Sequence, residues 1–230
     1  MLRVGGLTPL SSTDWPGMLS AVVFCQGCPW HCGYCHNPDL IPSRGEHEVA
    51  WPEVMAFLQR RRGLLDAVVF SGGEPTVHSA LPDAMREARA LGFRIGLHTG
   101  GMYPKKLAAV LPLVDWVGFD VKAPFDGYHR ITGVDGSGAP AAASLQQLIE
   151  SGVAYEVRTT VHPLLLDDAD VAAMAHDLAA RGVKHYVLQA FRSQGCDDAL
   201  LRQSAIRSRP LVEVGGELAG LFETFSVRVA

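Results

Sequence analysis

The segment FCQGCPWHCGYCHNP (24–38) follows directly on an apolar run, LSAVVFC (19–25). Three of its cysteines, Cys28, Cys32 and Cys35, have the spacing C-x3-C-x2-C. Three soft sulfur donors on one short loop can hold either a tetrahedral zinc ion or three corners of an iron–sulfur cube. The spacing therefore predicts a metal site at the end of the first buried strand.

The two kinds of metal site differ in what else they require. A zinc ion needs a fourth protein ligand, for which His31, His36 and Cys25 are available nearby. A cube held by three cysteines leaves one iron open to a small molecule that carries nitrogen and oxygen donors. The fifth cysteine, Cys196, lies far downstream, and this clustering argues against a disulfide framework.

The composition is that of a folded protein without a bulk positive charge. Of the 230 residues, 48% are apolar and 19% are charged, which excludes disordered and collagen-like chains. Acidic residues outnumber basic ones, 24 to 20, so neither nucleic acid nor a membrane surface is an expected partner. The opening segment MLRVGGLTPLSSTDWPG (1–17) has no long apolar stretch, and we expect a cytoplasmic protein.

Short β-branched apolar runs alternate with longer amphipathic stretches from about residue 19 onward. This pattern is typical of a parallel sheet with right-handed helical crossovers. The predicted strands are 19–25, 66–71, 93–99, 116–122, 154–162 and 184–190, and the predicted helices are 51–62, 79–91, 104–112, 142–151, 168–181 and 197–208. Six such units fit a doubly wound open sheet or a (β/α) barrel that stops short of eight units.

We predict one domain over residues 1–230, with a short segment (1–18) before the barrel (19–208) and a tail (209–230) after it. The segment 126–140 is rich in glycine and polar residues, which favours a mobile surface loop or a loop that covers a site. Residues 225–229, FSVRV, fit either an edge strand or a tail that docks on a partner.

The cysteine spacing, with Tyr34 just before the last cysteine, resembles the signature of the radical S-adenosylmethionine (radical SAM) enzymes. The resemblance implies a partial (β/α)6 TIM-like barrel with parallel strands and outer helices. It also implies that Cys28, Cys32 and Cys35 bind one 4Fe–4S cluster, whose open iron is chelated by the amino and carboxylate groups of S-adenosylmethionine.

Three further strand ends carry polar motifs that resemble those of this superfamily. Ser71-Gly72-Gly73-Glu74-Pro75 is similar to the GGEP motif, whose backbone and glutamate receive the ammonium group of the cofactor. His98-Thr99-Gly100 and Asp120-Val121-Lys122 are similar to segments that contact the cofactor in glycyl-radical activases. Strand ends carry the chemistry of (β/α) barrels, so these motifs are expected to share one mouth.

His98 and Arg158 are the two strand positions whose roles the motifs leave open. His98 stands where pyruvate formate-lyase activases have an aspartate that helps hold a monovalent cation, so the resemblance leaves the monovalent cation open. Arg158 is internal to the fifth predicted strand, where its charge must be paired. A place beside the cofactor and a purely structural ion pair are both consistent with it.

The whole chain, including STDWPG (12–17) and LQAFR (188–192), resembles the activating proteins of anaerobic ribonucleoside-triphosphate reductases. The chain has no cysteines left for the extra clusters that some other activases carry. The resemblance implies reductive cleavage of S-adenosylmethionine and transfer of the radical to a glycine of the partner reductase, with flavodoxin or ferredoxin as electron donor. A small-molecule radical enzyme, similar to 7-carboxy-7-deazaguanine synthase, and a zinc protein without radical chemistry are the alternatives.

Several other residues have a simpler interpretation. Cys25 fits a thiol buried in the core better than a redox group, and Cys196 fits an exposed thiol. His162 fits a hydrogen-bonded structural role better than a place in the site. Trp15, Trp30 and Trp51 either cover the core or form a surface for a partner.

Overall fold

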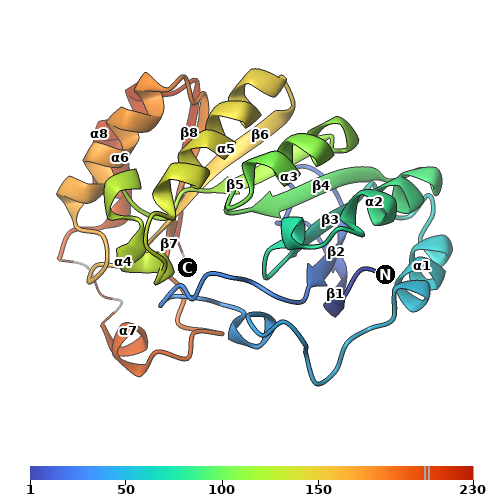
Figure 1. Ribbon diagram of the computed structural model, residues 1–230. Coiled ribbons are helices and arrows are strands. Elements are labelled where there is room, and N and C mark those ends of the chain that lie inside the picture. Colours follow the sequence, from blue (N-terminus) through green and yellow to red (C-terminus); the bar gives the residue numbers. More distant parts are fainter. Residues whose placement is uncertain (205, 207, 230) are drawn as a thin grey trace.

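The computed structural model describes residues 1–204, 206 and 208–229. It contains an eight-stranded sheet whose strands lie side by side in chain order, from β1 to β8 (Figure 1). β1 pairs antiparallel with β2, and every later neighbouring pair is parallel. The strands are β1 (Val4–Ser11), β2 (Ser20–Cys25), β3 (Ala67–Gly72), β4 (Arg94–Thr99), β5 (Trp116–Asp120), β6 (Ala154–Val161), β7 (His185–Ala190) and β8 (Thr224–Arg228).

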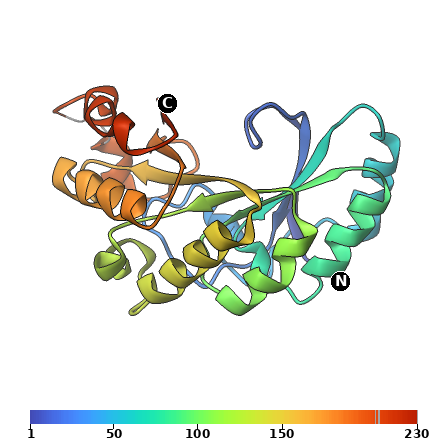
Figure 2. The ribbon, with the colours of Figure 1, turned by 90° about the horizontal axis from the view of Figure 1, so that it is seen from above.

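The helices follow the parallel strands, and most of them lie along the outer face of the curved sheet (Figure 2). They are α1 (Trp51–Arg60), α2 (Leu81–Ala90), α3 (Pro104–Val110), α4 (His129–Thr132), α5 (Gly138–Ser151), α6 (Asp168–Ala180), α7 (Ala199–Gln203) and α8 (Leu211–Leu218). Short 3-10 turns are η1 (Pro38–Leu40), η2 (Pro75–Val77), η3 (Leu111–Leu113), η4 (Phe125–Gly127) and η5 (Ala219–Leu221). The predicted α/β fold, a partial barrel with outer helices, is confirmed, and its six predicted strands are β2 to β7.

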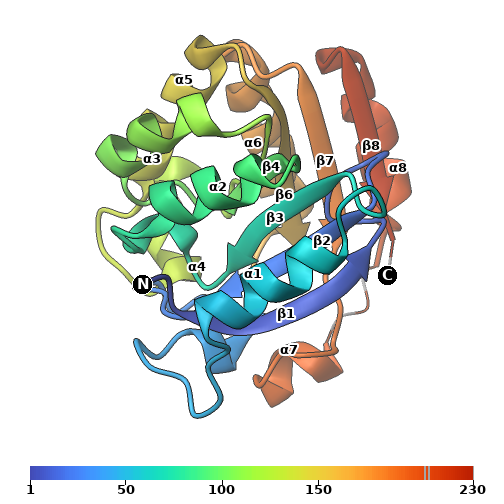
Figure 3. The same cartoon turned by 90° about the vertical axis from the view of Figure 1, so that its right-hand side faces the viewer.

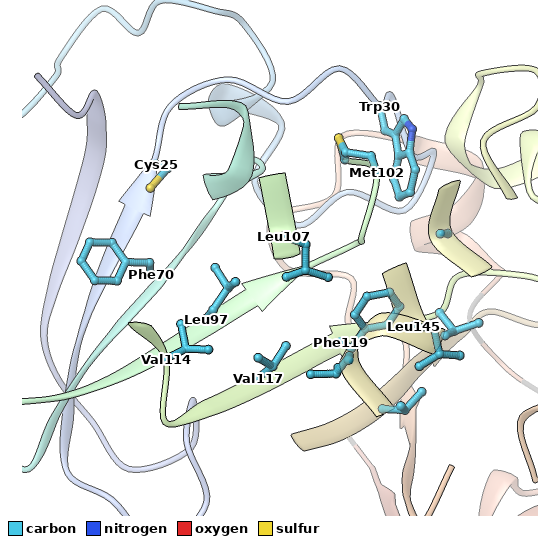
Figure 4. Close-up of a cluster of buried hydrophobic side chains, with 14 of the residues drawn as sticks. Cys25, Trp30, Phe70, Leu97, Met102, Leu107, Val114, Val117, Phe119 and Leu145 are labelled. Atoms are coloured by element: carbon cyan, nitrogen blue, oxygen red, sulfur yellow. The ribbon is translucent and has the colours of Figure 1, made fainter. Parts of the chain in front are cut away.

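The main core lies between the sheet and these helices (Figure 4). Phe70, Leu97 and Phe119 project from three successive strands and are fully buried together with Leu107 of α3 and Leu145 of α5. Burial of each such side chain contributes about 1.5–3 kcal/mol relative to exposure. The helices cover this face of the sheet, which explains why the predicted strands are continuous apolar runs.

A second, smaller core occupies the inner face of the sheet. It consists of Trp15, Val22, Ala67, Val69 and Trp116, and the two indole rings stack with centroids 5.5 Å apart. Trp15 comes from the loop that joins β1 to β2, so an N-terminal segment closes the inside of the partial barrel. Trp15, Trp30 and Trp51 are all buried, which confirms the interpretation that they cover the core.

Cys25 is fully buried in the main core, as expected for a structural thiol. The prediction for Cys196 was wrong, because its side chain is only 3% exposed and its Sγ donates to the Gly33 carbonyl at 3.6 Å. The apolar contacts of the neighbouring loops remove this thiol from solvent although the sequence around it is polar.

The segment 126–140 is not a mobile loop. It contains η4, α4 and the first turn of α5, and Tyr128, Ile131 and Thr132 are buried within it. The Tyr128 hydroxyl accepts a hydrogen bond from the Lys122 amide at 3.0 Å, which ties the segment to the end of β5. Distant contacts thus order a stretch whose local composition favours a loop.

The two ends of the chain add strands that lie outside the predicted barrel. β1 extends the sheet beyond β2, as Figure 3 shows, and β8 pairs with β7 at the opposite edge. The edge-strand interpretation of 225–229 is therefore confirmed. The predicted helix 197–208 is shorter than expected, since α7 ends at Gln203, and residues 205 and 207 lie outside the described part of the chain. No helix in the described residues has the length and apolar character needed to cross a membrane.

Candidate active site

A pocket lies at the carboxyl ends of β2 to β6, where the motifs read from the sequence meet. Its lining includes every residue predicted for the site: Cys28, Cys32, Tyr34, Cys35, Gly72, Gly73, Glu74, His98, Thr99, Asp120, Lys122 and Arg158. The polar ends of parallel strands open on one edge of a sheet, which is why residues far apart in sequence converge here. The convergence of three cysteines, two acids and two cations makes this pocket the candidate active site.

The cysteine loop (26–37) is held from two sides by backbone contacts. On one side the His31 amide donates to the Thr132 carbonyl at 2.9 Å, and the Gly33 amide donates to the Ile131 carbonyl at 3.3 Å. On the other side, Nε2 of His36 lies 3.0 Å from the carbonyl oxygen of Arg192, and the His36 ring stacks on the ring of Phe191. The loop is therefore fixed between α4 and the segment that follows β7.

The three thiols of this loop are half-buried and in reduced form. Burial raises the pKa of Cys28 to about 12 and raises the pKa values of Cys32 and Cys35 above the ordinary thiol value. Thiolates are the species that bind metal, so metal binding at this loop must release protons. Without a metal, the three side chains are therefore neutral thiols, and a bound metal would stabilise the thiolate form.

The donor set fits an iron–sulfur cluster with three protein ligands better than a zinc ion with four. Cys25 is buried in the main core and is absent from the pocket lining, and Nε2 of His36 is engaged by a backbone carbonyl. His31 is exposed and also absent from that lining. Within the described residues, no three Cys, His, Asp or Glu side chains gather closely enough for a single metal ion.

Gly72 and Gly73 bring the end of β3 against the root of the cysteine loop. A Cβ atom at Gly72 would lie 2.4 Å from the Cys25 amide nitrogen, and one at Gly73 would lie 2.4 Å from the Gly27 carbonyl oxygen. Gly72 also has φ +110°, a conformation that side chains disfavour. Both glycines are therefore required for this close packing, and it places the following Glu74 beside the loop.

Glu74 is a buried acid whose carboxylate accepts four hydrogen bonds. Its Oε1 accepts from the Thr76 amide (3.1 Å), the Thr76 hydroxyl (2.5 Å) and the Thr99 hydroxyl (2.8 Å), whereas Oε2 accepts from the Gly100 amide (3.0 Å). Burial raises the pKa of Glu74, and the hydrogen bonds from the threonines and Gly100 oppose that rise. Oε2 carries fewer donors than Oε1 and is the atom with capacity for a cationic group in the pocket.

Asp120 and Arg158 form the main ion pair of the pocket. Nε and Nη2 of Arg158 both lie 2.9 Å from Oδ1 of Asp120, and the Lys122 ammonium lies 3.7 Å from Oδ2. Burial raises the pKa of Asp120, but the charges of Arg158 and Lys122 outweigh it and hold that pKa below its ordinary value. Arg158 is thus paired, as its burial requires, and it also lines the pocket.

Lys122 also lies over the ring of Tyr34, with the ammonium 5.8 Å from the ring centroid. Tyr34 is 5% exposed and brings the cysteine loop under the end of β5. A cation over an aromatic face is attracted by the ring quadrupole. This contact joins the aromatic position of the cysteine signature to the D-x-K strand end.

His98 contacts three other parts of the chain. Its Nδ1 lies 3.0 Å from the Ser71 hydroxyl, its Nε2 lies 2.7 Å from the Asp14 carbonyl, and the ring packs edge-on against Trp116. Burial, together with the charge of Arg158, lowers the pKa of His98 to about 4, so the ring is neutral at pH 7. His162, by contrast, is bonded to backbone groups of Leu164 and Leu201, which confirms its structural role.

Sequence reasoning missed several residues that line the same pocket. Trp30, Asn37, Met102 and Thr160 are among them. Thr160 could have been found, because it lies two residues beyond Arg158 on one strand and side chains alternate between the faces of a strand. Trp30 and Met102 carry no local signal that separates a pocket wall from a core position.

Comparison with known proteins identifies the family of this chain. The model of the radical SAM superfamily matches residues 22–178. A protein of Methanocaldococcus jannaschii, named among the glycyl-radical enzyme activating enzymes, is 30% identical over 202 residues, covering 85% of this chain and 82% of its own. The pyruvate formate-lyase-activating enzyme of Clostridium pasteurianum is 30% identical over 177 residues, covering 74% and 73%.

A solved structure also shares the fold. Streptococcus suis SuiB bound to S-adenosylmethionine superposes with a TM-score of 0.66 at 10% identity, over 89% of this chain and 48% of SuiB. The match supports the partial-barrel architecture, and the family follows from the sequence matches. The chain therefore belongs to the radical SAM superfamily and, within it, to the family of glycyl-radical enzyme activating enzymes.

Proposed function

We propose that this protein activates an anaerobic (class III) ribonucleoside-triphosphate reductase by installing a glycyl radical on it. The observation that carries the proposal is the single pocket in which the three-cysteine loop meets Glu74 and the Asp120–Arg158 pair. The choice of reductase rests on the chain-wide resemblance described above. A family of activating enzymes whose members match most of this chain supports a protein substrate.

In this proposal Cys28, Cys32 and Cys35 hold one 4Fe–4S cluster, and one iron is left for S-adenosylmethionine. When bound, the reduced cluster and S-adenosylmethionine supply a one-electron cleavage that yields a radical able to take hydrogen from a glycine. The raised thiol pKa values mean that the chain binds the cluster with loss of protons. The protein itself supplies positioning and a pocket that restricts water.

The remaining pocket residues are assigned to the organic part of the cofactor. Oε2 of Glu74 accepts from its ammonium group, and the backbone of Gly72 and Gly73 lets the cofactor approach β3 closely. Tyr34, His98, Thr99, Asp120, Lys122 and Arg158 line the rest of its site.

Two fixed cations already neutralise Asp120 in this pocket. Arg158 and Lys122 lie 2.9 and 3.7 Å from its carboxylate oxygens. We therefore expect cofactor binding here not to depend on K⁺ or Na⁺. In this proposal, side chains of the protein supply the positive charge that a monovalent cation would otherwise bring.

The sheet has two edge strands, β1 and β8, so the partial barrel is open along one side. A loop of a partner protein can approach the pocket through such an opening. A closed barrel has no opening of this kind. We propose a cytoplasmic protein that takes its electron from a low-potential donor such as flavodoxin or ferredoxin. Neither nucleic acid nor membrane takes part in this scheme.

The test is EPR spectroscopy under anoxic conditions. The reconstituted, reduced protein is mixed with S-adenosylmethionine and an anaerobic ribonucleotide reductase, and the expected product is a glycine-centred doublet. Replacing the radical-bearing glycine of the reductase by alanine is the matched control and should abolish the doublet. Formation of 5′-deoxyadenosine only with a small heterocycle, and no protein radical, would instead favour the deazaguanine-type enzyme.

A further inference from the structure

The loop between β1 and β2 reaches into the barrel and ends against the candidate active site. Ser11 braces it, because its hydroxyl accepts from the Thr13 and Asp14 amides at 3.2 Å and donates to Asp14 Oδ2 at 2.5 Å. The Trp15 indole is 6% exposed and stacks on Trp116. A Cβ at Gly96 of β4 would lie 2.9 Å from this indole, so the indole fits here because Gly96 has no side chain.

The same loop presents a backbone carbonyl to His98. The Asp14 carbonyl lies 2.7 Å from Nε2 of His98, and the Ser71 hydroxyl lies 3.0 Å from Nδ1. The carbonyl can only accept a hydrogen bond and Nη1 of Arg158 can only donate one, so the two groups make opposite demands on Nε2. The carbonyl is the nearer group, at 2.7 Å against 3.2 Å, and we therefore place the proton of the neutral ring on Nε2. Nδ1 is then the acceptor and the Ser71 hydroxyl is the donor.

This assignment determines what Arg158 can do. Nη1 of Arg158 lies 3.2 Å from Nε2 of His98, but a protonated ring nitrogen cannot accept from it. The other two nitrogens, Nε and Nη2, are engaged by Asp120. Among the described residues Nη1 therefore has no acceptor, although the side chain is only 10% exposed and lines the pocket.

A buried guanidinium nitrogen without an acceptor carries a large desolvation penalty unless a ligand supplies one. Gly118 makes room for this arrangement, because a Cβ there would lie 2.8 Å from Cζ of Arg158 and 2.9 Å from Cδ2 of His98. The same Cβ would lie 2.9 Å from Nη1 of Arg158, so a side chain at this position would displace the guanidinium from its place beside His98.

We infer that the β1–β2 loop is a working part of the site: the Asp14 carbonyl holds His98 as a donor, and this reserves Nη1 of Arg158 for a carboxylate on the bound ligand. The inference rests on the proposed function, in which that carboxylate belongs to S-adenosylmethionine. His98 is a positioning residue in this account, since it acts through Arg158. The STDWPG motif thereby gains a role in ligand recognition.

The first test is ¹⁵N NMR of the histidine rings in the cluster-free protein, which reports the tautomer without any activity measurement. We expect His98 to show the Nε2–H form, and an Nδ1–H form would overturn the inference. This measurement stands even if the protein turns out not to cleave S-adenosylmethionine.

The second test compares the affinity of the reconstituted protein for S-adenosylmethionine and for its decarboxylated analogue. A hydrogen bond to a charged group is worth about 1.5–3 kcal/mol, which corresponds to a preference of about 10- to 100-fold for the carboxylate. His98→Glu places an acceptor beside Nη1 and should remove most of this preference, measured as the ratio of the two affinities within the same variant. His98→Gln, whose amide can still donate to Asp14, should retain it.

Arg158→Gln should lose the preference to the same extent as His98→Glu. Preservation of the preference in His98→Glu, with the melting temperature unchanged, would overturn the inference and leave the proposed function intact. If the wild-type protein bound neither compound, the proposed function would fail, and the tautomer measurement would still decide whether the loop sets the ring.

Discussion

The Thr99 hydroxyl donates a 2.8 Å hydrogen bond to Oε1 of Glu74, which joins the end of β4 to the turn after β3. Both residues are buried, at 3% and 1% exposure. The pocket wall is thus a continuous hydrogen-bonded unit, and Glu74 supports it as well as facing the ligand.

Glu74→Ala should preserve the cluster and weaken binding of S-adenosylmethionine. It leaves the amides of Thr76 and Gly100 and two hydroxyls without their acceptor, so we also expect a loss of about 1–3 kcal/mol in the free energy of unfolding. Equilibrium dialysis and urea denaturation measure the two effects separately. Glu53→Ala, an exposed acid in the first turn of α1, is the control. An unchanged cofactor affinity in Glu74→Ala would assign this glutamate to structure alone.

Cys32→Ser should lose the cluster, and Cys25→Ala should keep it. Cys32 lies on the loop that lines the pocket, whereas Cys25 is buried in the main core and absent from the lining. Iron and sulfide analysis after anoxic reconstitution distinguishes the two variants. Full iron content in Cys32→Ser would show that the ligand assignment is wrong.

Gly195→Ala should impair cluster loading more than Gly182→Ala. Both glycines have positive φ, +82° and +89°, so an alanine at either position strains the backbone by about 1–2 kcal/mol. Only at Gly195 would the new Cβ lie 2.4 Å from the His36 carbonyl oxygen, next to Cys35. The difference in iron content between the variants measures how strongly the segment after β7 holds the cysteine loop. Equal iron content would mean that this contact has no part in loading.

The stability of the protein should fall as the pH drops from about 6.5 towards 4. Burial, aided by Arg158, lowers the pKa of folded His98 to about 4, whereas an unfolded histidine titrates near 6.5. Within this window the unfolded chain binds more protons, so the free energy of unfolding rises with pH. His36 and His78, whose pKa values burial also lowers, contribute in the same direction.

The variant His98→Gln measures how much of this pH dependence of the unfolding free energy comes from His98. The slope of unfolding free energy against pH, measured by urea denaturation between pH 5 and 7, should be smaller in the variant than in the wild type. Identical slopes would contradict the assignment of a neutral, buried ring.

The six central strands could be predicted because each is a short apolar run bounded by glycine or polar residues. β1 could not, because its sequence VGGLTPLS contains two glycines and a proline and is only partly buried. α8 was missed for a similar reason, since LVEVGGEL contains two glycines within one helix. Pairing with β2 decides the conformation of β1, and packing of Gly215 against Phe225 and Val227 of β8 accommodates α8, although local propensity favours neither element.

The site was predictable where chemistry and position coincide. Cysteine spacing identified Cys28, and the resemblance of two strand-end motifs to those of the superfamily identified Glu74 and Asp120. The burial of Tyr128 and Cys196 against the cysteine loop depends on contacts between segments far apart in the chain. No local pattern reports contacts of that kind.

The most direct test of the central claim is EPR of the reduced, cluster-loaded protein before and after addition of S-adenosylmethionine. The account predicts about four irons per chain and a cluster signal that changes when the cofactor is added, because one iron has no protein ligand. A metal centre coordinated entirely by protein side chains, with a spectrum that S-adenosylmethionine leaves unaltered, would contradict it.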